Sequence, residues 1–232
     1  MLENLKKAVY EANMELFRRK LIIYTWGNVS GIDRDEGIVA IKPSGVAYEE
    51  LKAEDIVLLS LKDGKQVEGK LRPSSDTPTH LWLYRAFPQI GGVTHTHSPY
   101  ATAWAQAGRA IPCLGTTHAD YFRGEVPCTR FLTEKEIARD YEAETGHIIE
   151  EAFEGMNPIH TPGVLVRGHG PFTWGKSAEE SVYHAAVLEE TAKMAVTTFA
   201  LYPDAKPLPQ AMQNKHFERK HGKNAYYGQE KR

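Results

Sequence analysis

Apolar positions recur at helical spacing near both ends of the chain. Five of them near the N-terminus lie three or four residues apart, which predicts an amphipathic helix: Leu2, Leu5, Val9, Ala12 and Leu16. A second stripe predicts a long helix after the capping box at 177–180: Ala185, Leu188, Ala192, Val196 and Phe199. Pro203 is expected to end that helix.

The segments between these helices favour strands and shorter helices. Residues 28–33 and 37–42 flank an acidic turn, and residues 56–61 and 66–68 flank the hairpin dipeptide Asp63-Gly64. Strands are also expected over 91–97 and 163–167, and helices over 76–87, over 98–107 and from the capping box at Thr133 onward. The segment from Lys215 to Arg232 is expected to be a polar tail. The alternation predicts one α/β domain over 1–232 with a largely antiparallel sheet.

Composition narrows the class of protein. The 232 residues carry 28 Lys plus Arg and 30 Asp plus Glu, a formal charge of −2, which argues against a dedicated nucleic-acid binder, and no membrane partner is expected. No apolar stretch reaches the roughly 18 to 20 residues that span a bilayer. The N-terminus lacks the apolar run of a signal peptide, and two cysteines are too few for a disulfide framework, so we expect a cytoplasmic protein.

Histidines at two places suit a metal. His95 and His97 lie two apart on a predicted strand and therefore point to the same face, and His169 stands between two glycines after another strand. Two histidines at a polar strand end, and a hydrogen-bonded core histidine, remain alternatives. Asp76 and His80, four apart on one helix face, form a rival metal pair, unless Asp76 caps the helix.

Two loops of one kind are candidates for phosphate binding. Residues 42–45 read Lys-Pro-Ser-Gly, and residues 72–75 read Arg-Pro-Ser-Ser and precede a helix N-terminus. Amide donors at such a terminus, together with the helix dipole, favour anions. Two ordinary turns are the alternative.

Seven short motifs are distributed along nearly the whole chain. They are Trp26-Gly27-Asn28-Val29-Ser30, Lys42-Pro43-Ser44-Gly45, Pro73-Ser74-Ser75-Asp76, Thr94-His95-Thr96-His97-Ser98, Gly115-Thr116-Thr117-His118-Ala119-Asp120, His169-Gly170-Pro171-Phe172, and Lys220-His221-Gly222 with Ala225-Tyr226-Tyr227-Gly228-Gln229. Together they resemble the sugar-phosphate epimerases of the class II aldolase/adducin family over nearly the whole chain. The resemblance implies an α/β/α sandwich around a mainly antiparallel central sheet, and a homotetramer with active sites shared between subunits.

The resemblance also implies roles for individual residues. The implied Zn²⁺ ligands are His95, His97 and His169, with Asp76 as a fourth, acidic contact. The implied substrate and phosphate contacts are Gly27, Asn28, Lys42, Ser44, Gly45, Ser74 and Ser75, with supporting positions at Thr116, His216 and Arg219. Asp120 and Tyr227 match the acid/base pair, supplied by a neighbouring subunit through the C-terminal tail.

The implied reaction interconverts L-ribulose 5-phosphate and D-xylulose 5-phosphate. Carbon 4 carries no acidic proton, but it ends an aldol bond, so cleavage, rotation of glycolaldehyde phosphate and re-addition would invert it. Zinc, or another divalent metal that three imidazoles can hold, would stabilise the enediolate as a Lewis acid. The sequence leaves open whether such an enzyme serves arabinose use or the breakdown of ascorbate and related sugar acids.

Two rival functions remain. A class II sugar-phosphate aldolase of the fuculose-phosphate type shares the zinc and stops after cleavage. Those relatives carry glutamate where this chain has Asp76, and the shorter side chain is expected to hold the carboxylate back on the metal, which favours the epimerase. A non-enzymatic adducin-like module is disfavoured, because all three histidines are present.

Overall fold

A seven-stranded antiparallel sheet forms the middle layer of the protein. The computed structural model describes residues 2–223 and 225–227. The strands follow the spatial order β4-β3-β2-β1-β5-β7-β6, and each neighbouring pair is antiparallel. Their bounds are β1 Gly27–Asp33, β2 Ile38–Ile41, β3 Val57–Ser60, β4 Gln66–Glu68, β5 Gly92–Thr96, β6 Gly163–Val166 and β7 Gly170–Gly175.

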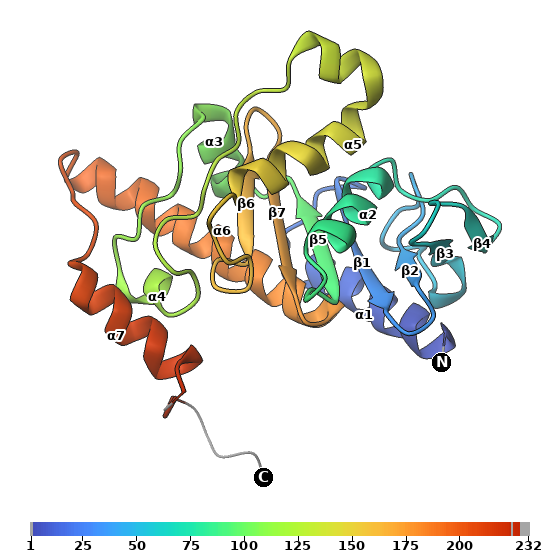
Figure 1. The fold of residues 1–232 in the computed structure, drawn as a ribbon, viewed down its shortest axis with the longest axis horizontal. Helices are drawn as coiled ribbons and strands as arrows, with labels where there is room; N and C mark the ends of the chain where they lie inside the picture. Colours follow the sequence, from blue (N-terminus) through green and yellow to red (C-terminus); the bar gives the residue numbers. More distant parts are fainter. Residues whose placement is uncertain (1, 224, 228–232) are drawn as a thin grey trace.

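Helices cover both faces of the sheet, which confirms the predicted α/β/α sandwich (Figure 1). One face carries α1 and α6, and the other carries α2 and α5. The helices are α1 Leu2–Arg18, α2 Thr77–Ala86, α3 Pro99–Ala107, α4 Thr116–Ala119, α5 Glu134–Ala152, α6 Ala178–Leu201 and α7 Gln210–His221, with a short 3₁₀ helix at Ala53–Asp55.

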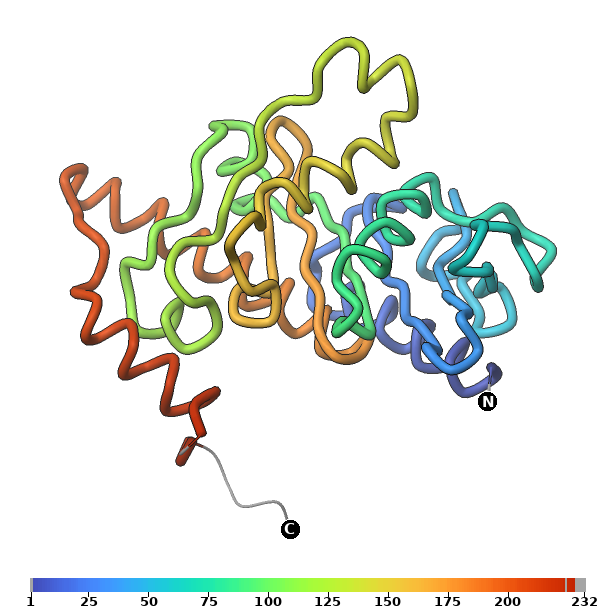
Figure 2. The backbone as a smooth tube through the Cα atoms, viewed as in Figure 1, coloured from blue at the N-terminus to red at the C-terminus, as the bar shows by residue number. Residues whose placement is uncertain are grey.

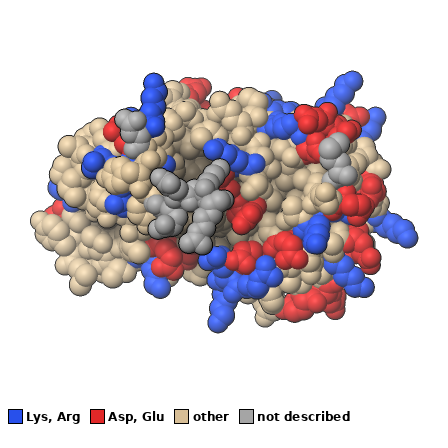
Figure 3. Space-filling view, turned by 90° about the horizontal axis from the view of Figure 1, so that it is seen from below, with Lys and Arg blue, Asp and Glu red and all other residues tan. Residues whose placement is uncertain are grey.

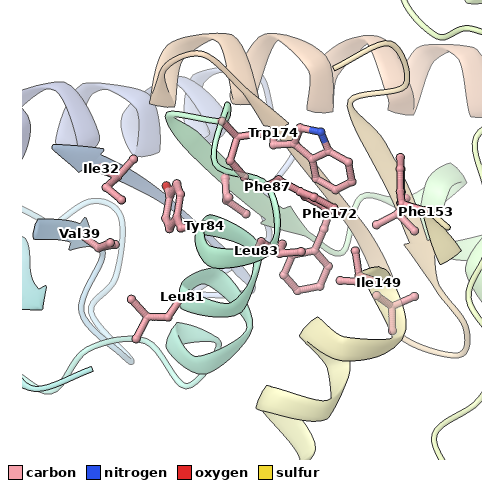
Figure 4. Packing of buried hydrophobic residues seen from close by; sticks show 14 of the residues in the cluster. Ile32, Val39, Leu81, Leu83, Tyr84, Phe87, Ile149, Phe153, Phe172 and Trp174 are labelled. Atoms are coloured by element: carbon pink, nitrogen blue, oxygen red, sulfur yellow. The ribbon is translucent and has the colours of Figure 1, made fainter. Parts of the chain in front are cut away.

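An aromatic cluster fills the space between the sheet and helices α2 and α5 (Figure 4). The Trp174 ring lies 5.3 Å from that of Phe87 and 5.1 Å from that of Phe153, measured between centroids. Phe172 belongs to the same cluster and is fully buried. Because Phe172 also stacks on His95 at 4.2 Å, the core directly supports one of the candidate metal ligands.

Of the two predicted capping boxes, one is complete and the other is only half formed. Thr133 and Glu136 form the complete capping box at the start of α5, with Glu136 Oε2 accepting from Thr133 N at 2.7 Å. At α6 the Ser177 hydroxyl caps the Glu180 N–H, but the Glu180 carboxylate accepts from the Lys176 N–H instead of closing the box. Both helices nevertheless begin where the sequence predicts.

Strand β7 and helix α7 differ from the sequence-based expectation. Strand β7 follows β6 after a tight turn. It begins with Gly-Pro, two residues that are uncommon in strands, so the sequence pattern did not predict it. The segment from Lys215 is polar as expected, but its first part belongs to α7, which runs from Gln210 to His221 and was not predicted. Only Phe217 of α7 is buried, so the helix has no apolar stripe that the sequence could reveal.

Helix α7 lies beside α4, at the opposite end of the molecule from the N-terminal helix (Figures 1 and 2). No helix in the described part of the chain is long and apolar enough to cross a membrane. On the face drawn in Figure 3, side chains of both charges are interspersed, in keeping with the formal charge of −2.

Candidate active site

Two neighbouring strands bring three histidines to one point. His95 lies on β5, His97 follows the last residue of β5, and His169 occupies the turn between β6 and β7. Strands β5 and β7 pair directly, with His95 opposite Phe172. One ligand nitrogen of each ring lies within 4.8 Å of the other two. The pair His95 and His97, which the strand spacing predicted, thus lies beside a third histidine that comes from the β6–β7 turn, far along the chain.

The state of the three imidazoles fits a metal ion. His95 Nδ1 lies 3.0 Å from the Pro171 carbonyl oxygen, which fixes the proton on Nδ1 and leaves Nε2 with a free lone pair. That Nε2 lies 3.1 Å from His97 Nε2, so the two rings aim at one position. Burial lowers the pKa of His95 to about 3 and also lowers those of His97 and His169. Three neutral imidazoles are a donor set that suits Zn²⁺.

Asp76 lines the same pocket but is not part of the histidine group. It occupies the N-cap position of α2 without a side-chain capping bond, and its Oδ2 accepts from Asn28 Nδ2 at 2.6 Å. Burial opposes its ionisation, yet the pKa lies below the ordinary value, and the hydrogen bond from Asn28 contributes by stabilising the carboxylate. Asp76 is therefore a carboxylate that faces the pocket, available as a further acidic contact.

The rival pair of Asp76 and His80 does not form a site. His80 is fully buried, its Nδ1 bonds to Ser30 Oγ at 2.7 Å, and its ring packs edge-on against Phe172. Burial lowers the pKa of His80 to about 3, so it stays neutral in the core. His80 thus belongs to the packing beneath the site.

The two serine-containing loops join each other along the pocket. Ser44 N donates to the Arg72 carbonyl at 2.9 Å, and Ser74 N donates to the Lys42 carbonyl at 3.1 Å. The Ser74 hydroxyl also accepts from Asn28 Nδ2 at 3.0 Å. The cavity of about 560 Å³ that they share with the histidines is also lined by Gly27, Asn28, Lys42, Ser44, Gly45, Ser74, Ser75 and Asp76. These loops are about 30 residues apart in the sequence, but in the structure they lie side by side and form one wall of the pocket.

Lys42 provides a buried positive charge beside these loops. Its Nζ donates to the Val46 carbonyl at 2.6 Å and lies 4.7 Å from the centre of the Tyr48 ring. Burial lowers the pKa of Lys42 to about 8. The ammonium is thus charged at neutral pH but poorly hydrated, a state that favours pairing with an anion.

Gly27 allows the start of β1 to pass close to β5, the strand that carries His95. Its φ is +123°, and a Cβ there would meet the His95 carbonyl oxygen at 2.7 Å. Both observations require glycine at this position. The preceding Trp26 lines the pocket with its ring 6.5 Å from that of His97.

A second polar cluster joins α4 to α7. The Asp120 carboxylate accepts from Arg219 Nε at 2.9 Å, from Arg219 Nη2 at 2.6 Å and from His216 Nδ1 at 3.1 Å. Burial raises the pKa of Asp120, but the bonds from Arg219 and His216 outweigh it and lower that pKa overall. The Arg219 guanidinium also lies 4.8 Å from the centre of the Tyr227 ring, and the Thr116 carbonyl accepts the Asp120 N–H at 2.9 Å.

None of these second-cluster residues lines the histidine pocket of the same chain. The structure therefore brings the site residues from the sequence into two separate groups. Gly228 and Gln229 of the tail motif lie outside the described residues.

Among the pocket residues that sequence reasoning did not name are two of α5, Tyr141 and Glu142. They follow Asp140, where the backbone leaves the helical conformation and α5 kinks. The Tyr141 hydroxyl lies 3.4 Å from His169 Nδ1. The capping box predicted one continuous helix, and nothing in the local sequence indicated that its middle turns toward the histidines.

Known proteins share this architecture. The family model of the Class II Aldolase and Adducin N-terminal domain matches residues 7–196. The chain belongs to the class II aldolase and adducin family. Members of this family named L-ribulose-5-phosphate 4-epimerase UlaF, from Salmonella paratyphi A and Salmonella typhi, are each 57% identical over 228 residues, covering 98% of this chain and 100% of the relative.

Solved structures of the family superpose over most of the chain. An L-fuculose 1-phosphate aldolase matches with a TM-score of 0.81 and 25% identity, covering 93% of this chain and 95% of the other. The L-fuculose-1-phosphate aldolase of Thermus thermophilus matches with a TM-score of 0.63 and 25% identity, covering 88% and 98%. This chain is thus similar both to proteins named as epimerases and to proteins named as aldolases.

Proposed function

We propose that this chain is a zinc-dependent L-ribulose-5-phosphate 4-epimerase that converts L-ribulose 5-phosphate and D-xylulose 5-phosphate into each other. The observation that carries the proposal is one pocket with two chemically different ends. Three neutral imidazoles converge at one end, and two joined serine loops with a buried lysine form the other. The 57% identity to the UlaF epimerases supports this choice of substrate.

The residues at the two ends divide the work. Zn²⁺ held by His95, His97 and His169 would supply Lewis-acid stabilisation of negative charge on substrate oxygens. The phosphate end, with Lys42 and the serine hydroxyls, keeps the two-carbon fragment bound after the carbon 3–carbon 4 bond breaks. Retention matters because the fragment must rotate and accept the electron pair of carbon 3 on its other face.

Proton transfer needs a group on each side of carbon 4, and we assign it to Asp120 and Tyr227. A base takes the proton of the carbon 4 hydroxyl during cleavage, and an acid returns one to the inverted oxygen. Since neither residue lines the histidine pocket of its own chain, we propose that a neighbouring copy supplies them. Such sharing fits a homotetramer in which His216 and Arg219 orient the Asp120 carboxylate, while the Thr116 carbonyl holds the Asp120 backbone N–H.

A fuculose-phosphate-type aldolase is the second candidate, because an L-fuculose 1-phosphate aldolase shares the fold with a TM-score of 0.81. An assay of the purified protein on L-ribulose 5-phosphate separates the two functions. We expect D-xylulose 5-phosphate to form without accumulation of free glycolaldehyde phosphate. Stoichiometric release of glycolaldehyde phosphate would instead establish aldol cleavage without re-addition, and no turnover of L-ribulose 5-phosphate would reject the epimerase.

Replacing Ser75 with alanine is expected to raise the KM for L-ribulose 5-phosphate about tenfold, the loss of about 1.4 kcal/mol that one hydrogen bond to a charged group contributes. Ser75 lines the pocket directly before α2, so its hydroxyl can reach a phosphate without supporting the core. Metal content should stay at the wild-type level. Unphosphorylated L-ribulose is the control substrate, and an equal KM increase for it would contradict phosphate contact.

The kcat/KM for L-ribulose 5-phosphate is expected to fall as pH rises through about 8. Lys42 has its pKa lowered to about 8 by burial, so the free enzyme carries the ammonium below that pH and loses it above. A phosphate dianion binds best to the charged form, and kcat/KM reports ionisation of the free enzyme. The Lys42→Met variant should have a lower kcat/KM without this alkaline step. An unchanged step in the variant would assign it to another group.

A further inference from the structure

The three candidate metal ligands are not equally supported by the protein. His95 is held by the Pro171 carbonyl and by stacking on Phe172. His169 instead sits in the β6–β7 turn between two glycines, the first with a φ of +75°. Among the described residues, the one polar side-chain partner of the His169 ring is the Tyr141 hydroxyl, 3.4 Å from Nδ1.

Side-chain hydrogen bonds from two helices hold Tyr141 at this place. Asp140 Oδ1 accepts from Ala143 N at 3.0 Å and thereby caps the second half of α5 after the kink. Thr145 Oγ1 donates to the Tyr141 carbonyl at 2.8 Å. From α2, Thr79 Oγ1 donates to the Glu142 carbonyl at 2.6 Å. The backbone of Tyr141 is therefore fixed against the helix that also carries Asp76 at its start.

We infer that Tyr141 is a positioning residue for the metal centre, which orients His169 through its phenolic oxygen. His169 Nδ1–H donates to the Tyr141 oxygen, so the proton stays on Nδ1 and Nε2 keeps its lone pair for the ion. This is the role that a carbonyl oxygen plays for His95. Such outer partners fix the ring orientation of a ligand and contribute to metal affinity. The inference deepens the proposed function and rests on it only in requiring that the three histidines bind a metal.

The geometry also sets the expected size of the effect. Loss of an outer hydrogen-bond partner commonly weakens metal binding about 10- to 100-fold. Because 3.4 Å is at the long end of hydrogen-bond distances, we expect the lower end of that range, about tenfold. His169 keeps its place in the turn in any case, since its backbone N–H donates to the Val166 carbonyl at 3.0 Å.

The test compares metal affinity in the full-length wild type, Tyr141→Phe and Tyr10→Phe. Tyr10 is a half-buried tyrosine of α1 that does not line the histidine pocket, so it controls for loss of a hydroxyl. Each protein is stripped of metal and titrated with Zn²⁺ against a chelator of known affinity. We expect a Kd about tenfold higher for Tyr141→Phe and no change for Tyr10→Phe. Equal Tm values of the metal-free proteins should show that the difference does not arise from folding.

A second measurement separates ligand geometry from substrate contact. At saturating Co²⁺, the visible absorption bands of Tyr141→Phe should differ from those of the wild type, whereas Tyr10→Phe should match it. A Zn²⁺ affinity within twofold of the wild type, together with an unchanged Co²⁺ spectrum, would overturn the inference and leave the proposed function intact. Failure of the wild type itself to bind Zn²⁺ or Co²⁺ would instead reject the metal-dependent function.

Discussion

Replacing His97 with asparagine is expected to abolish metal binding and epimerase activity together. His97 contributes one of three imidazole nitrogens, and its Nε2 points to the same position as that of His95, 3.1 Å away. Loss of an outer partner alone costs about 10- to 100-fold in affinity, so loss of a direct ligand should lower it more than about 100-fold. Metal analysis of the dialysed protein and an assay on L-ribulose 5-phosphate measure both effects.

The location of His97 makes this result easy to interpret. The residue follows the end of β5 and lies in the pocket wall, outside the buried core, so asparagine should not disturb the fold. His160→Asn is the matched control, because His160 is a half-buried histidine that lies neither in the pocket nor, among the described residues, in a group of potential metal ligands. Wild-type metal content in His97→Asn, or metal loss in His160→Asn, would contradict the ligand assignment.

Local sequence patterns predicted those parts of the fold and site that depend on short-range geometry. The alternation of a strand places His95 and His97 on one side, and the glycines around His169 indicated an unusual backbone. Helices with an apolar stripe, such as α1 and α6, were found for the same reason. These features depend on a few consecutive residues, so they can be predicted without knowing the tertiary structure.

Other parts of the site depend on contacts between distant segments. The bond from Asn28 to Asp76 and the pairing of the loops at Ser44 and Ser74 join residues that lie far apart in the sequence. Tyr141 enters the pocket through a kink inside an otherwise ordinary helix. Periodicity and capping rules describe only nearby residues, so they cannot predict these contacts between distant segments. The contacts form because the sheet places β1, β2 and β5 side by side.

Arg167 and Gly168, directly before His169, both pack against the Phe131 ring. Gly168 has a φ of +75°, and a Cβ at this residue would lie 3.0 Å from the Phe131 ring. The Arg167 guanidinium stacks over the same ring at 4.3 Å. Glycine and arginine therefore fit the β6–β7 turn against Phe131, which supports the turn that carries His169.

Replacing Tyr227 with phenylalanine is expected to lower turnover of L-ribulose 5-phosphate about a hundredfold or more, the usual contribution of a general acid or base. The ring lies under two cations, 4.8 Å from Arg219 and 4.3 Å from the Lys220 ammonium, and Arg219 also binds Asp120. The proposed acid and base are thus joined through one arginine. Phenylalanine keeps the ring and these cation contacts and removes only the hydroxyl that would exchange a proton with the carbon 4 oxygen.

Tyr226→Phe is the internal control for this prediction. Tyr226 and Tyr227 are 65% and 58% exposed in one chain, so neither substitution removes a buried contact that the fold needs. Both variants should keep the oligomeric state and metal content of the wild type, and Tyr226→Phe should keep most of its turnover. Near-normal turnover of Tyr227→Phe, or a larger loss in Tyr226→Phe, would move the proton-transfer role to another residue. Because the three histidines form a separate group, that outcome would leave the proposed metal-ligand assignment of His95, His97 and His169 unaffected.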